Sequence, residues 1–261
     1  MKPTILTLIF LISSFSFSQN NTIAAGEKLT FTASYKMSGL LTDLAQVTME
    51  TSEVKTSTST LFRLKCKART YSKWDSFFKI DDLYESYVSP TTLKPYLYKR
   101  EINEGNYYKF VKYNFNHKSK SVNSLLRQKS RNFESGFWDR EFTKTISTNT
   151  RDIVTTIYHI RNLDINKATN GSSDTFTILF DNEETNINIT LLGTETISTN
   201  IGKKECYKLA ISLSNSDILK GTNSNLLWLT ADANKIPVYA KFKAAIGSGE
   251  LRIQSATGLK H

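Results

Sequence analysis

The chain has 261 residues, of which 39% are hydrophobic and 11% aromatic, which is ample for a hydrophobic core. It carries 34 Lys and Arg against 24 Asp and Glu, a formal net charge of +10. This charge favours contact with anionic surfaces and says nothing about the fold. The only two cysteines, Cys66 and Cys206, are far apart in sequence, which excludes a CxxC motif.

The first 18 residues have the pattern of a cleavable export signal. Lys2 is followed by an apolar run over 5–17, and Ser16 and Ser18 place small side chains at the −3 and −1 positions before Gln19. The run is too short and too polar for a transmembrane span, which needs about 20 apolar residues, and no later stretch is long enough. The alternative is a buried N-terminal strand. We expect a signal peptide over 1–18 and one exported β domain over 19–261.

If the chain is exported, its location limits which anionic partners it can meet. Without Lys2 the net charge is 33 − 24 = +9. The anions outside the cytoplasm are lipid headgroups, lipopolysaccharide, acidic polysaccharides and other proteins, so nucleic acid is disfavoured. Cys66 and Cys206 could form a disulfide in that compartment, but two buried thiols are the favoured interpretation because a large domain needs no such link.

Period-two alternation predicts β-strands along most of the chain. The segments are 29–35, "TLFRLKCKART", "TFTILFD", "INITLLGTETIST", "ECYKLAISLS" and "LLWLTADANKIPVYAKFKA", followed by a last strand over 250–255. Pro237 must lie at a strand start or an edge. One segment differs, because helical spacing predicts a helix from Asp152 to about Leu163, capped by Thr150 or Asp152. A strand-rich chain with one principal helix is mainly β, with one antiparallel sheet in a barrel, half-barrel or sandwich.

The stretch from Asp81 to Phe115 is crowded with tyrosine, lysine and arginine. Its pattern predicts three successive antiparallel strands, with turns at "SPTT" and "NEGN". Alternation places Tyr96, Tyr98 and Arg100 on one face of a strand. It also groups Tyr107, Lys109, Val111, Tyr113 and Phe115 on a face of the next.

The sequence contains few of the residue patterns that catalytic sites require. The three histidines, His117, His159 and His261, have no metal-site spacing, and no GxSxG motif is present. We therefore expect no metal and no cofactor, and a protein that is not an enzyme. A hydrolase using Asp81, Glu85 or Glu104 stays as a less favoured alternative, because it needs two carboxylates held across one cleft.

A basic stretch without acids runs from Gly105 to Phe133. It could form a basic opening with an aromatic edge that meets anionic headgroups, or it could be ordinary solvated surface. The residues that would contact an anionic surface are Lys118, Lys120, Arg127, Lys129 and Arg131. Aromatic side chains follow in "NFESGFWDREF", among them Phe133, Trp138 and Phe142.

Several blocks of the chain resemble an exported bacterial family, the domain of unknown function 3108. They are "GEKLTFTASYKM", "DDLYESYVSPTTLKPYLYKREINEGNYYK", "DIVTTIYHIRNL", "GTETISTNIGKKECYKL" and "LWLTADANKIPVYAKFKAAIGSGEL". The resemblance implies a periplasmic or otherwise exported protein, and the periplasm of a Gram-negative bacterium is the location we expect. It also implies a strongly curved antiparallel sheet, similar to the half-barrels of periplasmic lipoprotein carriers, with a helix on the concave side. It does not imply a catalytic site. Among matching residues, Trp228 is expected in the core, and Glu85, Arg100 and Glu104 could form an arginine–carboxylate pair across adjacent strands.

These observations leave two main hypotheses. The favoured one is an envelope protein that binds an apolar or lipid-like ligand in the concavity of the sheet, because concave apolar pockets are the usual sites for small ligands. The candidate ligand contacts are Tyr84, Tyr96, Tyr98, Arg100, Tyr107, Tyr113 and Trp138. The alternative is an assembly or interaction module that binds an envelope protein or an anionic polymer.

Overall fold

The computed structural model describes residues 19–261 except 38, 75, 132–135, 214–224 and 244–246. The predicted export signal and Phe133 lie outside the described residues. Among the residues described, no helix is long and apolar enough to cross a membrane.

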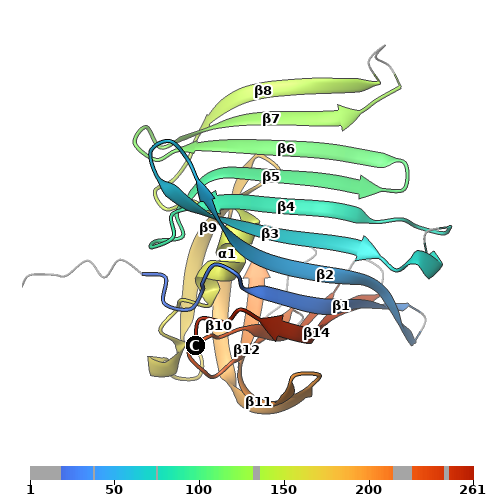
Figure 1. The fold of residues 1–261 in the computed structure, drawn as a ribbon, viewed down its shortest axis with the longest axis vertical. Coiled ribbons are helices and arrows are strands. Elements are labelled where there is room, and N and C mark those ends of the chain that lie inside the picture. Colours follow the sequence, from blue (N-terminus) through green and yellow to red (C-terminus); the bar gives the residue numbers. More distant parts are fainter. Residues whose placement is uncertain (1–18, 38, 75, 132–135, 214–224, 244–246) are drawn as a thin grey trace, which may run out of the picture.

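The described chain forms one antiparallel sheet of 14 strands (Figure 1). Their order is β8-β7-β6-β5-β4-β3-β2-β1-β14-β13-β12-β11-β10-β9. The first eight strands are β1 (Lys28–Met37), β2 (Leu40–Lys55), β3 (Thr60–Thr70), β4 (Asp81–Val88), β5 (Pro95–Glu104), β6 (Tyr107–Asn116), β7 (Ser121–Lys129) and β8 (Phe137–Thr145). The remaining six are β9 (Ser173–Phe180), β10 (Glu183–Thr199), β11 (Gly202–Leu213), β12 (Leu226–Thr230), β13 (Pro237–Lys243) and β14 (Ser248–Thr257).

This sheet confirms the predicted fold class, a single curved antiparallel sheet that stays open. The stretch that begins at Asp81 forms the three predicted successive strands, β4, β5 and β6. Pro237 is the first residue of β13, the position that its missing N–H allows.

Bulges help the sheet to curve. Register shifts occur in the pairs β1–β14, β1–β2, β4–β5, β10–β11 and β12–β13. An extra residue at each bulge bends the strand and increases its local twist. In the β10–β11 pair the shift falls at Gly193, whose φ of 146° suits glycine.

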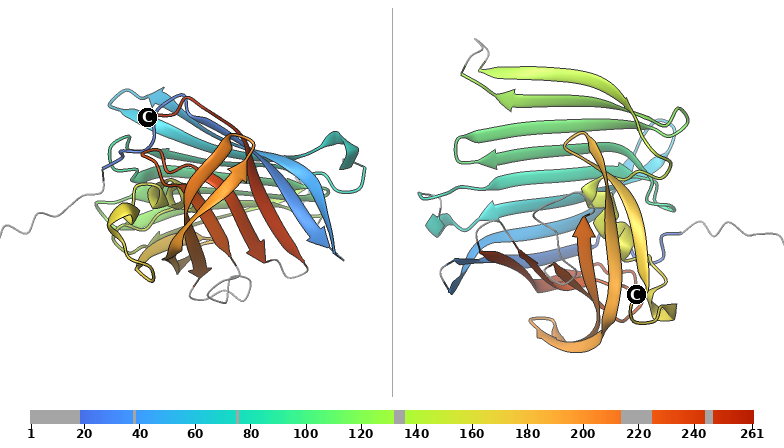
Figure 2. Two further views of the ribbon diagram at one scale, coloured as in Figure 1. Left: turned by 90° about the horizontal axis from the view of Figure 1, so that it is seen from below. Right: turned by 180° about the vertical axis from the view of Figure 1, so that it is seen from behind.

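The helix α1 (Ile153–Ile160) lies on the concave side, between the two halves of the sheet (Figure 2). It belongs to the connection between β8 and β9, which are consecutive in the chain but form opposite edges of the sheet. The connection also contains a short 3₁₀ turn, η2 (Ile165–Lys167); a second such turn, η1 (Ser72–Trp74), precedes β4. The N-cap of α1 is Asp152, one of the two predicted caps, and its carboxylate accepts the N–H of Thr155.

Two hydrophobic clusters meet at this helix. The larger joins buried residues of β1–β7, β9 and β11–β14 to Val154 and Tyr158 of α1. The smaller joins β9–β12 to Ile160. We use "inner face" for the side of the sheet that contacts α1. Trp228 is 4% exposed within the larger cluster, as predicted.

Candidate functional site

Four of the predicted ligand contacts lie together on the inner face of β4, β5 and β6, and we call them the tyrosine–arginine cluster. Tyr84 is paired with Arg100 and Tyr98 with Tyr113 across neighbouring strands. The rings of Tyr98 and Tyr113 stack with 5.5 Å between their centroids. Tyr98, Arg100 and Tyr113 are all less than 5% exposed. These side chains are therefore part of the packed interior.

The turn between β9 and β10 covers this cluster. Asp181 in the turn forms an ion pair with Arg100 and a second one with Lys109, whose Nζ lies 2.8 Å from Oδ1. The backbone N–H of Asn182 donates to the Tyr113 hydroxyl at 2.9 Å, and the Phe180 ring lies 4.6 Å from the Arg100 guanidinium carbon. Both residues of the turn have positive φ, 47° and 67°, which Asp and Asn tolerate better than most side chains. The chain thus closes this part of its own concavity.

Two buried hydrogen-bond donors of the tyrosine–arginine cluster have no acceptor in the described part of the chain. The Tyr98 hydroxyl and Arg100 Nε are buried without a hydrogen-bond partner among the residues that the structure describes. A buried polar group in this state costs about 1–3 kcal/mol. A polar group on a ligand could satisfy these donors only after the β9–β10 turn moved away.

Beyond the turn, part of the inner face of β6, β7 and β8 is uncovered (Figure 2, right). The strand register places two rows there, Lys109–Gln128–Trp138 and Val111–Leu126–Arg140, with Phe142 next along β8. Leu126, Trp138 and Phe142 are half-buried and Arg140 is exposed. We call this surface the open inner face, defined as Tyr107, Lys109, Leu126, Gln128, Trp138, Arg140 and Phe142. It combines apolar side chains with basic ones, a combination that suits an apolar chain ending in an anionic group.

The other predicted ligand contacts divide between two places. Tyr107 is the first residue of β6, is 44% exposed, and lies at the margin of the open inner face together with Trp138. Tyr96 lies at the opposite end of β5, is 45% exposed, and packs its ring edge-on against His117. Tyr96 is therefore remote from the site that the other residues define.

The residues predicted to contact an anionic surface lie far apart in the structure. Lys118 and Lys120 lie in the β6–β7 turn, whereas Lys129 and Arg131 lie at the other end of β7, a strand of nine residues that spans about 30 Å. Arg127 points to the outer face, where its Nε and an η nitrogen donate to the Asp139 carboxylate at 2.8 and 2.6 Å. The basic stretch thus forms no single patch.

The predicted arginine–carboxylate pair among Glu85, Arg100 and Glu104 was wrong, because Glu85 and Arg100 each pair with a residue outside this set. Glu85 pairs with Arg63 of the neighbouring strand, and Arg100 pairs with Asp181. The positions of the candidate carboxylates also argue against the hydrolase hypothesis. Glu104 shares the inner face with Arg100, whereas alternation turns Asp81 and Glu85 to the outer face, so these carboxylates do not flank one cleft.

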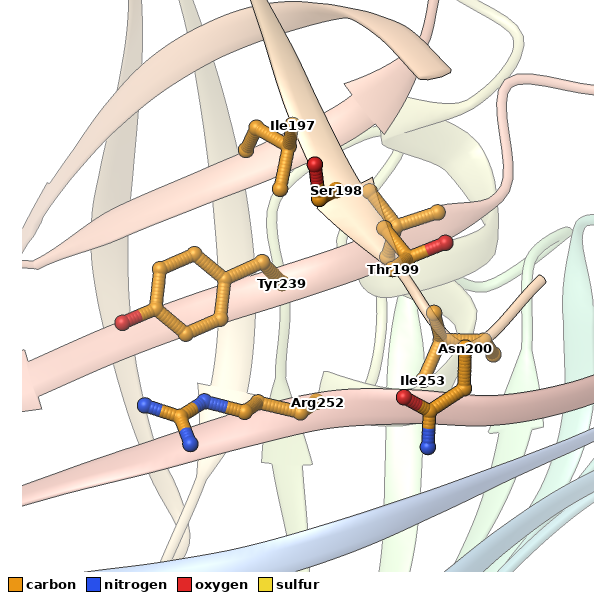
Figure 3. A pocket seen from close by; sticks show the side chains of 8 residues that line it. Ile197, Ser198, Thr199, Asn200, Tyr239, Arg252 and Ile253 are labelled. Carbon is orange, nitrogen blue, oxygen red and sulfur yellow. The ribbon is translucent and has the colours of Figure 1, made fainter. Parts of the chain in front are cut away.

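A separate pocket of about 400 Å³ lies between the distal half of β10 and strands β13 and β14 (Figure 3). Ile197, Val238 and Ile253 supply its apolar lining. Tyr239 and Arg252 extend side by side, with the guanidinium carbon 5.8 Å from the ring centroid (Figure 3). Arg252 also pairs with Glu250 at 2.6 Å. Its cation is therefore already compensated, which makes this pocket a weaker anion site than the open inner face.

Reactive side chains are held in inert states. Cys66 and Cys206 are both free thiols, and burial raises their pKa values to about 12 and about 11, so they stay protonated at neutral pH. Burial lowers the pKa of His117, and its Nε2 contacts the Pro95 carbonyl. Within the described residues, no group of three or more His, Cys, Asp or Glu side chains could hold a metal ion.

Fold and site together define a β half-barrel with an open inner face. The chain belongs to the family described as "Protein of unknown function (DUF3108)", whose model matches residues 30–254. Its fold is similar to that of a β-barrel-like protein of domain of unknown function DUF1849 from Brucella abortus. The TM-score is 0.56 at 7% identity, over 89% of this chain and 97% of that chain.

Two other solved structures were matched at lower similarity. A Bacteroides fragilis protein, provisionally described as exported and with a YmcC-like fold, gives a TM-score of 0.36 at 9% identity, over 90% of this chain and 96% of that one. A Parabacteroides distasonis protein, provisionally described as a lipoprotein, gives 0.32 at 11% identity, over 92% and 98%. No curated protein matches the chain in sequence.

Proposed function

We propose that this is an exported, non-enzymatic protein of the bacterial envelope that holds an apolar, lipid-like ligand on its open inner face. Export is supported by the signal pattern of residues 1–18. Ligand binding is supported by one observation above all. Leu126, Trp138 and Phe142 are only half-buried on the concave side of a curved sheet, where the side chains of a closed barrel would be covered.

The chemistry of this face selects the ligand class. An acyl chain laid along β7 and β8 would remove the half-exposed parts of Leu126, Trp138 and Phe142 from water, which is favourable at about 25 cal/mol per Å². Arg140 is exposed on the same face, whereas Lys109 at its edge is already paired with Asp181. An anionic group on the ligand would meet the Arg140 guanidinium there, so the proposed ligand is an acyl chain that carries a carboxylate or phosphate.

A matched pair of variants tests the site. Trp138 lies on the inner face, and its neighbour Phe137 lies on the outer face, where it contacts Tyr108. In a titration of residues 19–261 with a fluorescent fatty-acid analogue, Trp138→Ala should weaken binding about tenfold, since loss of one aromatic contact is worth about 1.4 kcal/mol. Phe137→Ala should leave binding near the wild-type value. Equal losses in both variants, or a wild-type protein that binds no analogue, would contradict the proposal.

One observation favours a second candidate function. β8 is an edge strand of nine residues, so one side of its backbone has no neighbouring strand in the sheet. An envelope protein could add a strand there, a common mode of recognition between proteins. Chemical cross-linking in cells would test this interaction module, and a protein that stays a monomer throughout would exclude it.

A further inference from the structure

Exposed apolar side chains gather along one rim of the sheet. In an antiparallel meander, alternate connections lie at the same end, and the β1–β2, β3–β4, β5–β6 and β7–β8 connections share one edge in Figure 1 (right side). We call this edge the apolar rim, defined by Leu40, Phe77, Phe78, Tyr107, Phe137 and Phe242. They are six of the eight large hydrophobic residues that the structure exposes, at 73%, 83%, 51%, 44%, 36% and 39%.

The connections of the apolar rim contact one another. The β13–β14 end meets β1, where Lys36 pairs with Ser248. The Trp74 indole N–H donates to the Asp43 carbonyl of β2 at 2.8 Å. The N–H of Gly105 in the β5–β6 turn donates to the Lys79 carbonyl of the β3–β4 connection at 2.8 Å. Neighbouring connections are therefore held to one another along the apolar rim.

The β3–β4 connection presents the two most prominent aromatic side chains. Phe77 and Phe78 follow the short 3₁₀ turn η1, and both of their backbone N–H groups donate to the Trp74 carbonyl, at 2.9 and 3.0 Å. The Phe77 ring packs edge-on against Trp74 with 6.3 Å between centroids. Hydrogen bonds thus hold these aromatic side chains in an exposed position, where they gain nothing from burial in the protein's own core.

Basic side chains accompany the apolar ones along the same rim. Exposed cations of its strand ends and connections are Lys36, Lys73, Lys79, Lys129, Arg131 and Lys243. Of the described acids nearby, Asp81, Asp139 and Glu250 are paired with Lys67, Arg127 and Arg252. Glu104 is half-buried, and Asp43 is exposed and accepts from Ser34 at 2.6 Å, so the six cations outnumber the two acids that have no ion pair among these. Asp75 and Glu134 lie outside the described residues. The described part of the rim is therefore apolar and positively charged.

We propose that the apolar rim docks on the surface of a lipid bilayer that contains anionic lipids. Single aromatic side chains flanked by lysines suit the boundary between headgroups and acyl chains, where the ring is buried and the ammonium group meets phosphate. A protein partner would need a broad contact of about 800 Å² per side, whereas the rim is a row of strand ends and turns.

Docking there would also serve the proposed ligand site, although the inference does not depend on it. Tyr107 and Trp138, at the margin of the open inner face, are the first residue of β6 and the second of β8, so that face opens at the rim. A rim placed on a bilayer would bring the opening of the site to the lipid.

Co-sedimentation with vesicles tests the proposal on residues 19–261. The protein should sediment with vesicles of phosphatidylcholine and phosphatidylglycerol, and weakly with phosphatidylcholine alone. Phe77→Ser with Phe78→Ser should lower partitioning about tenfold or more, because two exposed aromatic anchors are lost. Lys73→Glu with Lys79→Glu should lower it for the anionic vesicles specifically.

Matched variants at the opposite rim serve as controls. Tyr96→Ser removes an aromatic residue that is 45% exposed, and Lys118→Glu with Lys120→Glu reverses two exposed charges. Both should leave partitioning unchanged. Trp138→Ala should still sediment, which separates docking from ligand binding. No sedimentation with anionic vesicles, or equal losses at both rims, would overturn the proposal.

Discussion

At the scale of single residues, His159 shows how packing sets the chemistry of an ionisable group. It lies on α1, is 7% exposed, and its ring meets Phe176 of β9 edge-on at 5.0 Å between centroids. Burial, together with the neighbouring Arg151 guanidinium, lowers the pKa of His159 from 6.5 to about 3. The side chain is therefore neutral in the folded protein at any physiological pH and cannot act as a proton donor there.

This lowered pKa predicts that the contribution of His159 to stability is lost in acid, in opposition to Asp82, whose pKa burial raises to about 6. Below pH 6.5 the unfolded chain protonates His159 and the folded chain does not, so stability falls as pH drops from 6.5 towards 3. By pH 5 the loss is about 2 kcal/mol. In urea unfolding, His159→Gln should lose less stability than the wild type between pH 8 and pH 5. An identical pH dependence in both proteins would show that His159 titrates normally.

Sequence reasoning at this scale succeeded for local properties and failed for long-range partners. The two cysteines are free, as the favoured interpretation of the sequence held, and Trp228 is buried. The family resemblance indicated Arg100 as a residue of interest but suggested the wrong partner for it. Asp181 is 81 positions away in the chain and reaches Arg100 only because the β9–β10 hairpin folds over the sheet.

At the scale of elements, a buried ion pair fixes α1 to the start of β1. Arg161, the C-cap of the helix, is 0% exposed, and its guanidinium donates to both oxygens of Glu27 at 2.6 and 2.7 Å. It also donates to the Asn234 carbonyl at 3.0 Å. One side chain therefore joins the helix, the residue before β1 and the β12–β13 turn.

Removing one partner of this pair should be costly. Glu27→Gln leaves the arginine charge buried and uncompensated, which typically costs about 3–5 kcal/mol. Urea unfolding followed by circular dichroism would measure the loss. Asp139→Asn, which breaks the exposed pair with Arg127, should leave the unfolding midpoint unchanged. Similar effects of the two variants would contradict the structural role assigned to Glu27.

The sequence predicted most elements because each has a local signature. Period-two alternation identified eleven of the fourteen strands but missed β2, β7 and β8, and 121–145 was interpreted instead as a basic stretch followed by aromatic residues. The helix expected from Asp152 to about Leu163 spans Ile153–Ile160, with Asp152 as its cap. The sequence could not show that β9 and β10 cross the inner face of β5–β8. That packing depends on contacts between distant segments, which no local pattern encodes.

At the scale of the whole molecule, the sheet stays open between β8 and β9, which are consecutive in the chain but lie at its opposite edges. β8 and β9 are joined by a segment that crosses the concavity and carries α1. The β9–β10 turn then covers the tyrosine–arginine cluster and leaves the open inner face uncovered. Of the predicted ligand contacts, Tyr107 and Trp138 belong to this face, and four others form the covered cluster.

The apolar rim was missed by sequence reasoning for a physical reason. Its members come from separate connections that only the meander brings to one edge. The adjacent Phe77 and Phe78, between lysines and outside any alternating segment, are the one local signal that could have indicated it.

Native mass spectrometry tests the central claim most directly. The protein would be purified gently from the envelope of its own cells, and any bound material extracted into organic solvent. The account predicts a discrete added mass that corresponds to an acyl-chain compound with a carboxylate or phosphate, and predicts that Trp138→Ala reduces it while Phe137→Ala does not. A clean protein mass with no bound compound, from cells in which the protein is folded and exported, would contradict it.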